Sequence, residues 1–397
     1  MPKRPSIQNQ SGASPPPDLN GTSRLIVVGA SAGGVEALTQ LARGLPDDFP
    51  ASILVVIHIS PQAPSLMPAI LNRSGPLPAE HAENGETIRP GRIYVAPPNR
   101  HLLVKPGRLM LTVGPKENSA RPAVDPLFRT AARAYGPWVV GVILSGGLDD
   151  GTVGLLEVKR NGGVAVVQDP EDAPFPGMPE SAVRNVDVDH VLPLSDIPAL
   201  LVHLANKPVP RAKGAAFMKH RRDTDEPDIS EVGTDALKSK PLPGPPSAFT
   251  CPECGGALWE LASDNLLRYR CHVGHAYTAE ALASAQVEKL EDALWSAVRA
   301  LEEHAAMRRR MAARALKGNL SQMAEQYQNQ AGAAEARAAV IREVLVNGRK
   351  GTARRENAEE VAKESHDRGP GTGRNSHPQP NRRRTNSHPR QSKPHNA

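Results

Sequence analysis

The chain has 397 residues, enough for about two or three domains. Hydrophobic residues make up 39% of it, diluted by 39 prolines and 33 glycines, which indicates ordinary folded cores joined by linkers and tails. No apolar stretch approaches the roughly 20 residues that cross a bilayer, and the first residues lack the apolar region of a secretory signal. We therefore expect a cytoplasmic protein without membrane insertion.

The net charge of +6 arises in the C-terminal tail. Residues 349–397 contain twelve Lys and Arg against five Asp and Glu, so the rest of the chain is close to neutral. The tail is rich in Pro, Asn, Ser and His, a composition that cannot bury a core. We interpret it as a solvated tail rather than a nucleic-acid or membrane patch, and we expect no nucleic-acid partner.

The N-terminal half predicts an α/β fold. Residues 1–23 are polar and proline-rich, which predicts disorder; in residues 24–206, β-branched apolar runs then alternate with helical segments. The predicted strands are Leu25–Val28, Ile53–Ile59, Arg92–Ala96, Trp138–Leu144 and Val164–Val167. The predicted helices are Gly34–Arg43, Val124–Ala134, Thr152–Arg160 and Glu180–Val186, and Leu102–Gly114 predicts an antiparallel hairpin. This alternation predicts a doubly wound, mostly parallel sheet with helices on both faces.

The C-terminal half is organised differently. Residues 207–248 are charged and proline-rich, which predicts a linker. Residues 249–278 hold all three cysteines and predict a small zinc-ribbon-like module. Residues 279–347 predict a helical hairpin or coiled coil, and residues 348–397 predict a disordered basic tail. The helical segments are Ala279–Leu316 and Leu320–Val346. The second segment carries a coiled-coil-like seam of Leu320, Ala324, Tyr327, Ala331, Ala334, Ala338, Ile341 and Leu345. Small alanines bury little area per turn, so we expect a partner helix, from the hairpin or from self-association of two copies.

A candidate nucleophile lies in Gly29-Ala30-Ser31-Ala32-Gly33-Gly34, which follows a predicted strand and opens a helix, as the G-x-S-x-G pattern requires. A nucleophilic hydroxyl must project from a sharp turn, and flanking side chains would block that turn. The helix N-terminus adds free N–H groups, so the N–H of Ala32 is a candidate oxyanion donor. Two alternatives are a Rossmann phosphate loop, which would need a glycine at Ser31 and an acidic residue after the next strand, and a serine that caps the helix.

His58 and Asp150 are the candidate base and acid. His58 stands at the carboxyl end of the second predicted strand, and Asp150 just follows another buried strand. Taken singly, each has a plain alternative, a packed core histidine and a turn or cap aspartate. Together with Ser31, however, they fall on one edge of a parallel sheet, as a catalytic triad requires. The order Ser–His–Asp also disfavours an ordinary α/β-hydrolase fold.

Several motifs then agree in order and spacing with a known family. They are VVGASAGGVEAL around Ser31, the strand ending in His58, RPAVDPLF at 121–128, SGGLDDG at 145–151 and PGMPESAV at 176–183. Over roughly residues 24–205 the chain resembles the catalytic domain of the chemotaxis protein-glutamate methylesterases. The resemblance implies hydrolysis of glutamate γ-methyl esters on the cytoplasmic helices of chemoreceptors, often with glutamine deamidation, and no catalytic cofactor.

The same resemblance assigns residues to roles. It places the nucleophile at Ser31, the base at His58, the acid at Asp150 rather than Asp149, and a second oxyanion donor at the N–H of Gly147. Leu148 stands where many relatives have a glycine. We expect a standalone form without the family's N-terminal receiver domain, and hence no activation by aspartyl phosphate on this chain. The competing hypothesis is a non-catalytic signalling scaffold that uses the hydrolase-like domain, the cysteine module and the coiled coil to bind partners.

The cysteines form a second candidate site. Cys251 and Cys254 are separated by two residues, and Cys271-His272-Val273-Gly274-His275 follows sixteen residues later. This spacing is typical of a Cys₃His zinc ribbon, in which four protein ligands make a closed, structural site. We prefer His275 as the fourth ligand, because His272 adjoins Cys271 and would bind with strain. The alternative is a set of free thiols.

Overall fold

The computed structural model describes residues 23–58, 64–209, 244–261 and 266–367, with side chains described as far as residue 347. The predicted disordered N-terminus, most of the predicted linker and the end of the basic tail lie outside the described residues. The chain divides into two compact units, residues 1–290 and 291–397, and each is described by itself.

A seven-stranded sheet forms the centre of the first unit. Its strands are β1 (Leu25–Ala30), β2 (Ser52–Ile57), β3 (Ala79–His81), β4 (Ile93–Val95), β7 (Val139–Ile143), β8 (Val164–Gln168) and β9 (His190–Leu192). Their order is β3-β4-β2-β1-β7-β8-β9, and all neighbours are parallel. Every residue of β1 and β2 is buried, as continuous apolar runs require. The chain extends the sheet first to one side of β1 and then to the other, so a topological switch point lies at β1 and β7.

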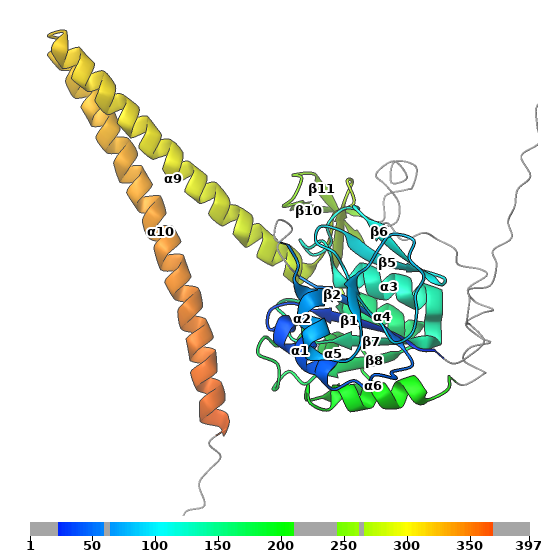
Figure 1. The fold of residues 1–397 in the computed structure, drawn as a ribbon. Helices are drawn as coiled ribbons and strands as arrows, with labels where there is room; N and C mark the ends of the chain where they lie inside the picture. Colours follow the sequence, from blue (N-terminus) through cyan, green and yellow to red (C-terminus); the bar gives the residue numbers. More distant parts are fainter. Residues whose placement is uncertain (1–22, 59–63, 210–243, 262–265, 368–397) are drawn as a thin grey trace, which may run out of the picture. The chain divides into compact units, whose positions relative to one another are not determined.

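Helices cover both faces of this sheet (Figure 1). Helices α1 (Gly34–Arg43), α2 (Met67–Ser74) and α6 (Ile197–Asn206) pack on one face around a single apolar cluster. Helices α3 (Val124–Tyr135), α4 (Thr152–Arg160) and α5 (Gly177–Asn185) pack on the other, together with the hairpin of β5 (His101–Lys105) and β6 (Arg108–Thr112). A short 3₁₀ turn, η1 (Gly136–Trp138), leads from α3 into β7. The predicted doubly wound parallel sheet is confirmed.

The differences from the predicted elements have local reasons. Strands β3 and β9 were not predicted, because they have three residues each and show no periodicity. Helices α2 and α6 were not predicted either; they start at Met67 and Ile197, each directly before a proline. The predicted strand Ile53–Ile59 ends earlier, at Ile57, so His58 follows β2 directly. Helix α5 begins three residues before the predicted Glu180, at Gly177.

The cysteine-containing segment folds as a small antiparallel sheet of β10 (Pro246–Thr250), β11 (Ala257–Leu261), β12 (Arg268–Cys271) and β13 (Ala276–Thr278), which we call the cysteine module. Strand β10 begins inside the predicted linker, two residues before its expected end. Leu258 and Tyr277 form the module's core together with Leu282 from the first turn of α9 (Ala279–Lys317). A core this small buries little apolar area, so the module needs another source of stability.

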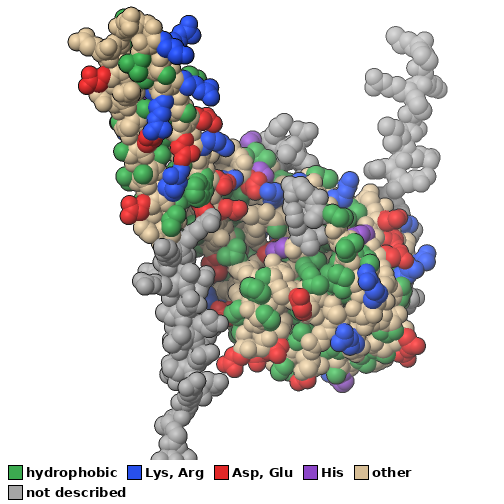
Figure 2. Space-filling model, turned by 60° about the vertical axis from the view of Figure 1, so that its left-hand side comes forward, with side chains coloured by type: hydrophobic (Ala, Val, Ile, Leu, Met, Phe, Trp, Pro, Cys, Tyr) green, Lys and Arg blue, Asp and Glu red, His purple; other side chains and the backbone are tan. Residues whose placement is uncertain are grey.

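In the second unit, the part of α9 from residue 291 onward packs along α10 (Ser321–Asp367) as the predicted helical hairpin. Val298 packs with Ala338 and Leu345, while Ala305 packs with Ala331 and Ala334, which is an antiparallel pairing that occupies the predicted seam. Acidic and basic side chains are intermixed on the face of these helices seen in Figure 2, and Arg309 forms an ion pair with Glu335. Helix α10 runs past the predicted end at Val346, so the predicted boundary of the tail at residue 348 lies within it. No helix of the described residues is long and apolar enough to cross a membrane.

Candidate active site

Ser31 lies on the turn between β1 and α1, at the switch point of the sheet. Its backbone N–H donates to the Ser145 carbonyl after β7, at 3.0 Å, which ties the turn to the neighbouring strand. Gly33 caps α1 with a left-handed φ of 71°, a conformation that glycine adopts without strain. No side chain caps α1, so Ser31 does not play the capping role considered as an alternative. Its hydroxyl faces His58 instead.

The three predicted triad residues form one chain of hydrogen bonds. His58 Nδ1 lies 3.2 Å from Ser31 Oγ, and His58 Nε2 lies 2.8 Å from Asp150 Oδ2. The backbone contributes to this meeting, because His58 N–H donates to the carbonyl of Ala30, beside the serine. The His58 side chain is 22% exposed and that of Asp150 only 2%, so the imidazole is accessible to a ligand while the carboxylate is shielded from water.

The surroundings of Asp150 hold it ionised. Burial raises the pKa of its carboxyl, but hydrogen bonds and the charge of His58, the Val124 N–H and the Asn118 amide outweigh burial and bring the pKa below its ordinary value. An ionised carboxylate only accepts hydrogen bonds, so Nε2 of His58 carries the proton. When the imidazole is neutral, Nδ1 then presents its lone pair to the Ser31 hydroxyl, which is the tautomer that a general base needs.

Two neighbouring aspartates behave in the opposite way. Burial, followed by the charge of Asp150, raises the pKa of Asp125 to about 8 against the opposing charges of Arg129 and Arg268. Burial also raises the pKa of Asp149 to about 6, although a hydrogen bond from Thr278 opposes the rise. Of the three carboxyls, only Asp150 has a lowered pKa, and it is Asp150 rather than Asp149 that bonds to His58.

The predicted oxyanion donors lie on the two loops around Ser31. Gly146 is so close to the nucleophile turn that an added Cβ would lie 2.9 Å from Ser31 Cβ. The next residue, Gly147, is exposed, with no atom within 4 Å of the place of a Cβ. Within the described part of the chain, neither the N–H of Ala32 nor that of Gly147 donates to a backbone carbonyl. Both amides are thus available to a ligand.

The rim of this site is apolar. Phe175 is 49% exposed and its ring would touch a Cβ added at Gly33, and Leu148 is 44% exposed. Leu148 adopts a φ of 59°, in the left-handed region that glycine favours, so the loop before Asp150 follows the path of a glycine at a cost of about 1 kcal/mol. Exposed apolar side chains beside the Ser31 hydroxyl suit a ligand that presents its own hydrophobic surface.

Residues that the sequence analysis did not assign complete the surroundings of Asp150. Its Oδ2 also accepts the Val124 N–H at 2.7 Å, and its Oδ1 accepts the Asp125 N–H at 3.2 Å and the Asn118 amide at 3.1 Å. Val124 and Asp125 belong to the RPAVDPLF motif, which was noted without a role for either. Asn118 belongs to no motif, and its only local signal is the turn-forming Asn-Ser pair at 118–119.

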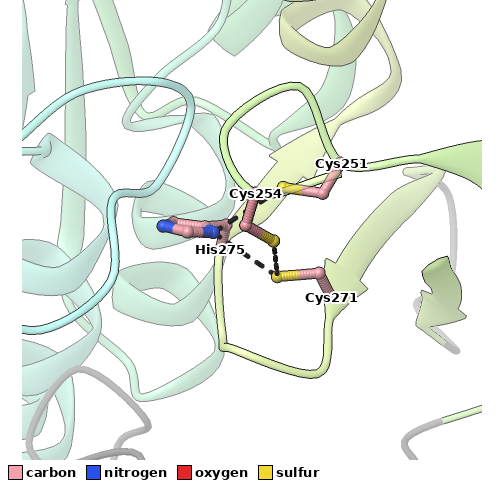
Figure 3. Close-up of side chains that lie close together, drawn as sticks. All are labelled: Cys251, Cys254, Cys271 and His275. Carbon is pink, nitrogen blue, oxygen red and sulfur yellow. Dashed lines mark hydrogen bonds between the residues drawn. The ribbon is translucent and has the colours of Figure 1, made fainter. Parts of the chain in front are cut away.

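The cysteine module brings its predicted ligands together (Figure 3). The side chains of Cys251, Cys254, Cys271 and His275 point toward one another from the β10–β11 and β12–β13 turns, with their ligand atoms within 4.8 Å. Cys254 Sγ lies 3.7 Å from Cys271 Sγ, and His275 Nδ1 lies 3.5 Å from Cys271 Sγ and 3.6 Å from Cys251 Sγ. His272 is exposed and is not one of the four.

These separations fit a tetrahedral metal. With zinc–sulfur bonds of about 2.3 Å and zinc–nitrogen bonds of about 2.05 Å, a tetrahedron has sulfur–sulfur edges of about 3.8 Å and sulfur–nitrogen edges of about 3.6 Å. Three of the six edges, at 3.7, 3.5 and 3.6 Å, agree with these lengths, and all six ligand-atom separations lie within 4.8 Å. Burial and the neighbouring Cys251 raise the pKa of the Cys271 thiol to about 12, an opposition to thiolate formation that a divalent cation would reverse.

Comparison with known proteins supports the enzyme class. Residues 26–201 match the family model described as CheB methylesterase. A protein of Leptospira interrogans, provisionally named protein-glutamate methylesterase/protein-glutamine glutaminase, is 41% identical over 180 residues, which are 45% of this chain and 93% of that protein. Protein-glutamate methylesterase FrzG of Myxococcus xanthus is 38% identical over 200 residues, 50% of this chain and 59% of that one.

Other relatives are longer than the matched region. The chain spans about half the length of protein-glutamate methylesterase/protein-glutamine glutaminase 2 of Anaeromyxobacter dehalogenans, at 41% identity over 45% of this chain and 53% of that one. The crystal structure of the Thermotoga maritima CheB methylesterase catalytic domain is 36% identical and covers 46% of this chain and 99% of that one, with a TM-score of 0.45.

The extent of these matches places residues 26–201 in one class of enzyme, the esterases. The chain belongs to the CheB methylesterase family.

Proposed function

We propose that this protein is a protein-glutamate methylesterase that uses Ser31, His58 and Asp150 as nucleophile, base and orienting acid. The observation that carries the proposal is the unbroken hydrogen-bond chain from Ser31 Oγ through both nitrogens of His58 to the buried Asp150. A non-catalytic scaffold has no need of an ionised buried carboxylate aligned behind a partly exposed imidazole, so turnover is the better account of this geometry.

In the first half-reaction His58 Nδ1 takes the proton as Ser31 Oγ attacks the γ-ester carbonyl carbon. The resulting oxyanion accepts hydrogen bonds from the N–H groups of Ala32 and Gly147. Asp150 stabilises the imidazolium without taking its proton. When the tetrahedral intermediate collapses, His58 returns the proton to the departing methoxide, methanol leaves and a glutamyl ester of Ser31 remains.

Water completes the cycle. His58 removes a proton from a water molecule, the hydroxide adds to the acyl carbon, and the second tetrahedral intermediate expels Ser31 Oγ, which recovers its proton from His58. The product is a glutamate carboxylate. A glutamine side chain could enter the same route with ammonia as the leaving group, which would provide the glutaminase activity that the relatives' names include.

We propose a methylated, chemoreceptor-like helical protein as the substrate and the cytoplasm as the place of reaction. A helix presents a glutamate ester on a convex surface flanked by apolar residues three and four positions away. The exposed rim side chains Phe175 and Leu148 could pack against such a surface while the ester reaches Ser31.

We propose further that Cys251, Cys254, Cys271 and His275 hold a structural zinc ion. Four protein ligands leave no open coordination position, so the ion would stabilise the cysteine module and take no part in ester hydrolysis. The predicted domain limits, 24–206 for the catalytic domain and 249–278 for the module, remain predictions, as does self-association through the C-terminal helices.

The test is methanol release from methylated receptor fragments by the purified full chain, together with labelling by a fluorophosphonate. Ser31→Ala and His58→Ala should each lower kcat by several orders of magnitude, and Ser31→Ala should abolish labelling. Ser195→Ala, the same change at an exposed serine before α6, serves as the control. Near-normal methanol release by Ser31→Ala would exclude the proposed nucleophile.

A further inference from the structure

The cysteine module contacts the catalytic domain through its last strand, β13. Ala276 N–H donates to the Lys116 carbonyl at 3.3 Å, and Asn118 N–H donates back to the Ala276 carbonyl at 2.9 Å. The backbones of Glu117 and Ala276 thereby pair in parallel, as two residues of neighbouring β-strands do. The loop at 116–118 thus joins the edge of the module's sheet. An ion pair of 2.7 Å between Lys116 and Glu253 lies beside it.

Asn118 connects this edge to the proposed catalytic acid. Its side-chain oxygen accepts the Thr278 N–H at 3.1 Å, while its side-chain nitrogen donates to Asp150 Oδ1 at 3.1 Å and to Asp125 Oδ2 at 3.2 Å. The amide is therefore used at both ends, with β13 on one side and the carboxylate behind His58 on the other. The oxygen of an amide accepts hydrogen bonds and its nitrogen donates them. Because the Thr278 N–H requires the oxygen, the nitrogen of Asn118 is left to face Asp150.

Thr278 makes a second connection to the same loop. Its hydroxyl donates to Asp149 Oδ1 at 2.8 Å and accepts the Ala281 N–H at 3.1 Å, where it caps the first turn of α9. Thr278 is 2% exposed and Asp149 is 2% exposed, so water does not replace these contacts. Two residues adjacent in sequence, Asp149 and Asp150, are thus both held by contacts that originate in β13.

The predicted metal ligands lie directly beside β13 in the chain. His275 immediately precedes Ala276, the first residue of the strand, and Cys271 ends the preceding strand β12. Cys271 N–H also donates to the His275 carbonyl at 3.0 Å across the turn. Only two residues, Ala276 and Tyr277, therefore separate the predicted ligand His275 from Thr278. The small apolar core of the module provides little other constraint on this turn.

We infer that the cysteine module is a positioning element of the esterase site: metal binding at Cys251, Cys254, Cys271 and His275 fixes β13, and β13 holds Asn118 against Asp150. The inference rests on the proposed function, because it assigns to Asn118 the support of the proposed acid. Asn118 is a positioning residue, and zinc acts on turnover only through it. The module thereby makes ester hydrolysis depend on metal loading.

The experiment measures kcat, KM and the rate of fluorophosphonate labelling for the full chain with zinc, after zinc removal by a chelator, and after zinc is added back. Zinc removal should lower kcat and the labelling rate about tenfold or more, with KM little changed, and added zinc should restore both. Asn118→Ala should lower kcat by a similar factor with zinc bound, because a hydrogen bond to a buried carboxylate is lost.

A double comparison tests the connection itself. In Asn118→Ala the link is already cut, so zinc removal should lower its kcat far less than it lowers that of the unaltered chain. Thr278→Val removes the hydroxyl but keeps the backbone N–H that Asn118 accepts, so it should lower stability and retain kcat. Loss of the α9 cap alone would change stability without changing kcat. Ser247→Ala, which removes a hydroxyl bonded to Leu258 within the module, is the control and should behave as the unaltered chain.

The outcomes separate the two proposals. Absence of esterase activity and of Ser31 labelling in the zinc-loaded chain would contradict the proposed function. An active, labelled enzyme that keeps its kcat when zinc is removed would overturn the inference alone. So would equal losses on zinc removal in Asn118→Ala and the unaltered chain, or a tenfold loss of kcat in zinc-loaded Thr278→Val, which would place the connection at the hydroxyl and not at Asn118.

Discussion

Replacing Asp150 by asparagine removes one charge and exchanges one acceptor for a donor. Asp150 accepts two hydrogen bonds at each oxygen, from Asn118 and the Asp125 N–H at Oδ1 and from His58 and the Val124 N–H at Oδ2. An amide nitrogen placed at either position would face two N–H donors. The variant therefore cannot satisfy this site in either orientation.

The less costly orientation places the new amide nitrogen toward His58. The imidazole can then accept from it at Nε2 by moving its own proton to Nδ1, which relieves one of the two donor–donor contacts. The opposite orientation would require Asn118 to turn over, and its nitrogen would then face the Thr278 N–H. With the proton on Nδ1, however, His58 cannot accept the proton of Ser31. We expect kcat to fall about 10⁴-fold, the effect of the wrong imidazole tautomer in a triad.

The assay is methanol release from methylated receptor fragments across pH 6 to 9, with circular dichroism to show that the fold is retained. Asp187→Asn, the same change at an exposed aspartate before β9, is the control and should keep full activity. A loss of tenfold or less in Asp150→Asn would refute the role of the carboxylate in selecting the tautomer, whatever its distance from His58.

Two further changes test the loop that carries Asp150. Burial raises the Asp149 pKa to about 6, so between about pH 4 and 6 the native state binds more protons than the unfolded chain. The contribution of Asp149 to the free energy of unfolding therefore falls as pH rises through that window, and it stays low above it. Asp149→Asn should therefore raise the free energy of unfolding by about 2 kcal/mol at pH 7.5 and hardly at all at pH 4, measured by urea denaturation; a difference that does not vary with pH would contradict this. Gly146→Ala would put a Cβ 2.9 Å from Ser31 Cβ and against the Met178 side chain, and should lower the fluorophosphonate labelling rate at least tenfold; labelling at the normal rate would mean that the loop can move aside freely.

The order of elements around the site was predictable because it depends on local chemistry. The runs Leu25–Val28 and Trp138–Leu144 are apolar at successive positions, which only strands buried on both faces require, and the glycines around Ser31 permit a sharp strand-to-helix turn. Carboxyl ends of parallel strands share one edge, so the meeting of Ser31, His58 and Asp150 followed from topology. Three-residue strands such as β3 and β9 are too short to show a period, and they were missed.

The cysteine spacing likewise determined that a ligand cluster would form, since two short turns can bring four donors together wherever the module lies. Which side chains support Asp150 was a matter of tertiary structure alone. Asn118 lies 32 residues before Asp150 and 160 before Thr278, and its neighbours in sequence carry no pattern that points to either. Residues so far apart meet only when the packing of the module's β13 along residues 116–118 brings them together, and no local periodicity encodes the edge at which two separately folded sheets join.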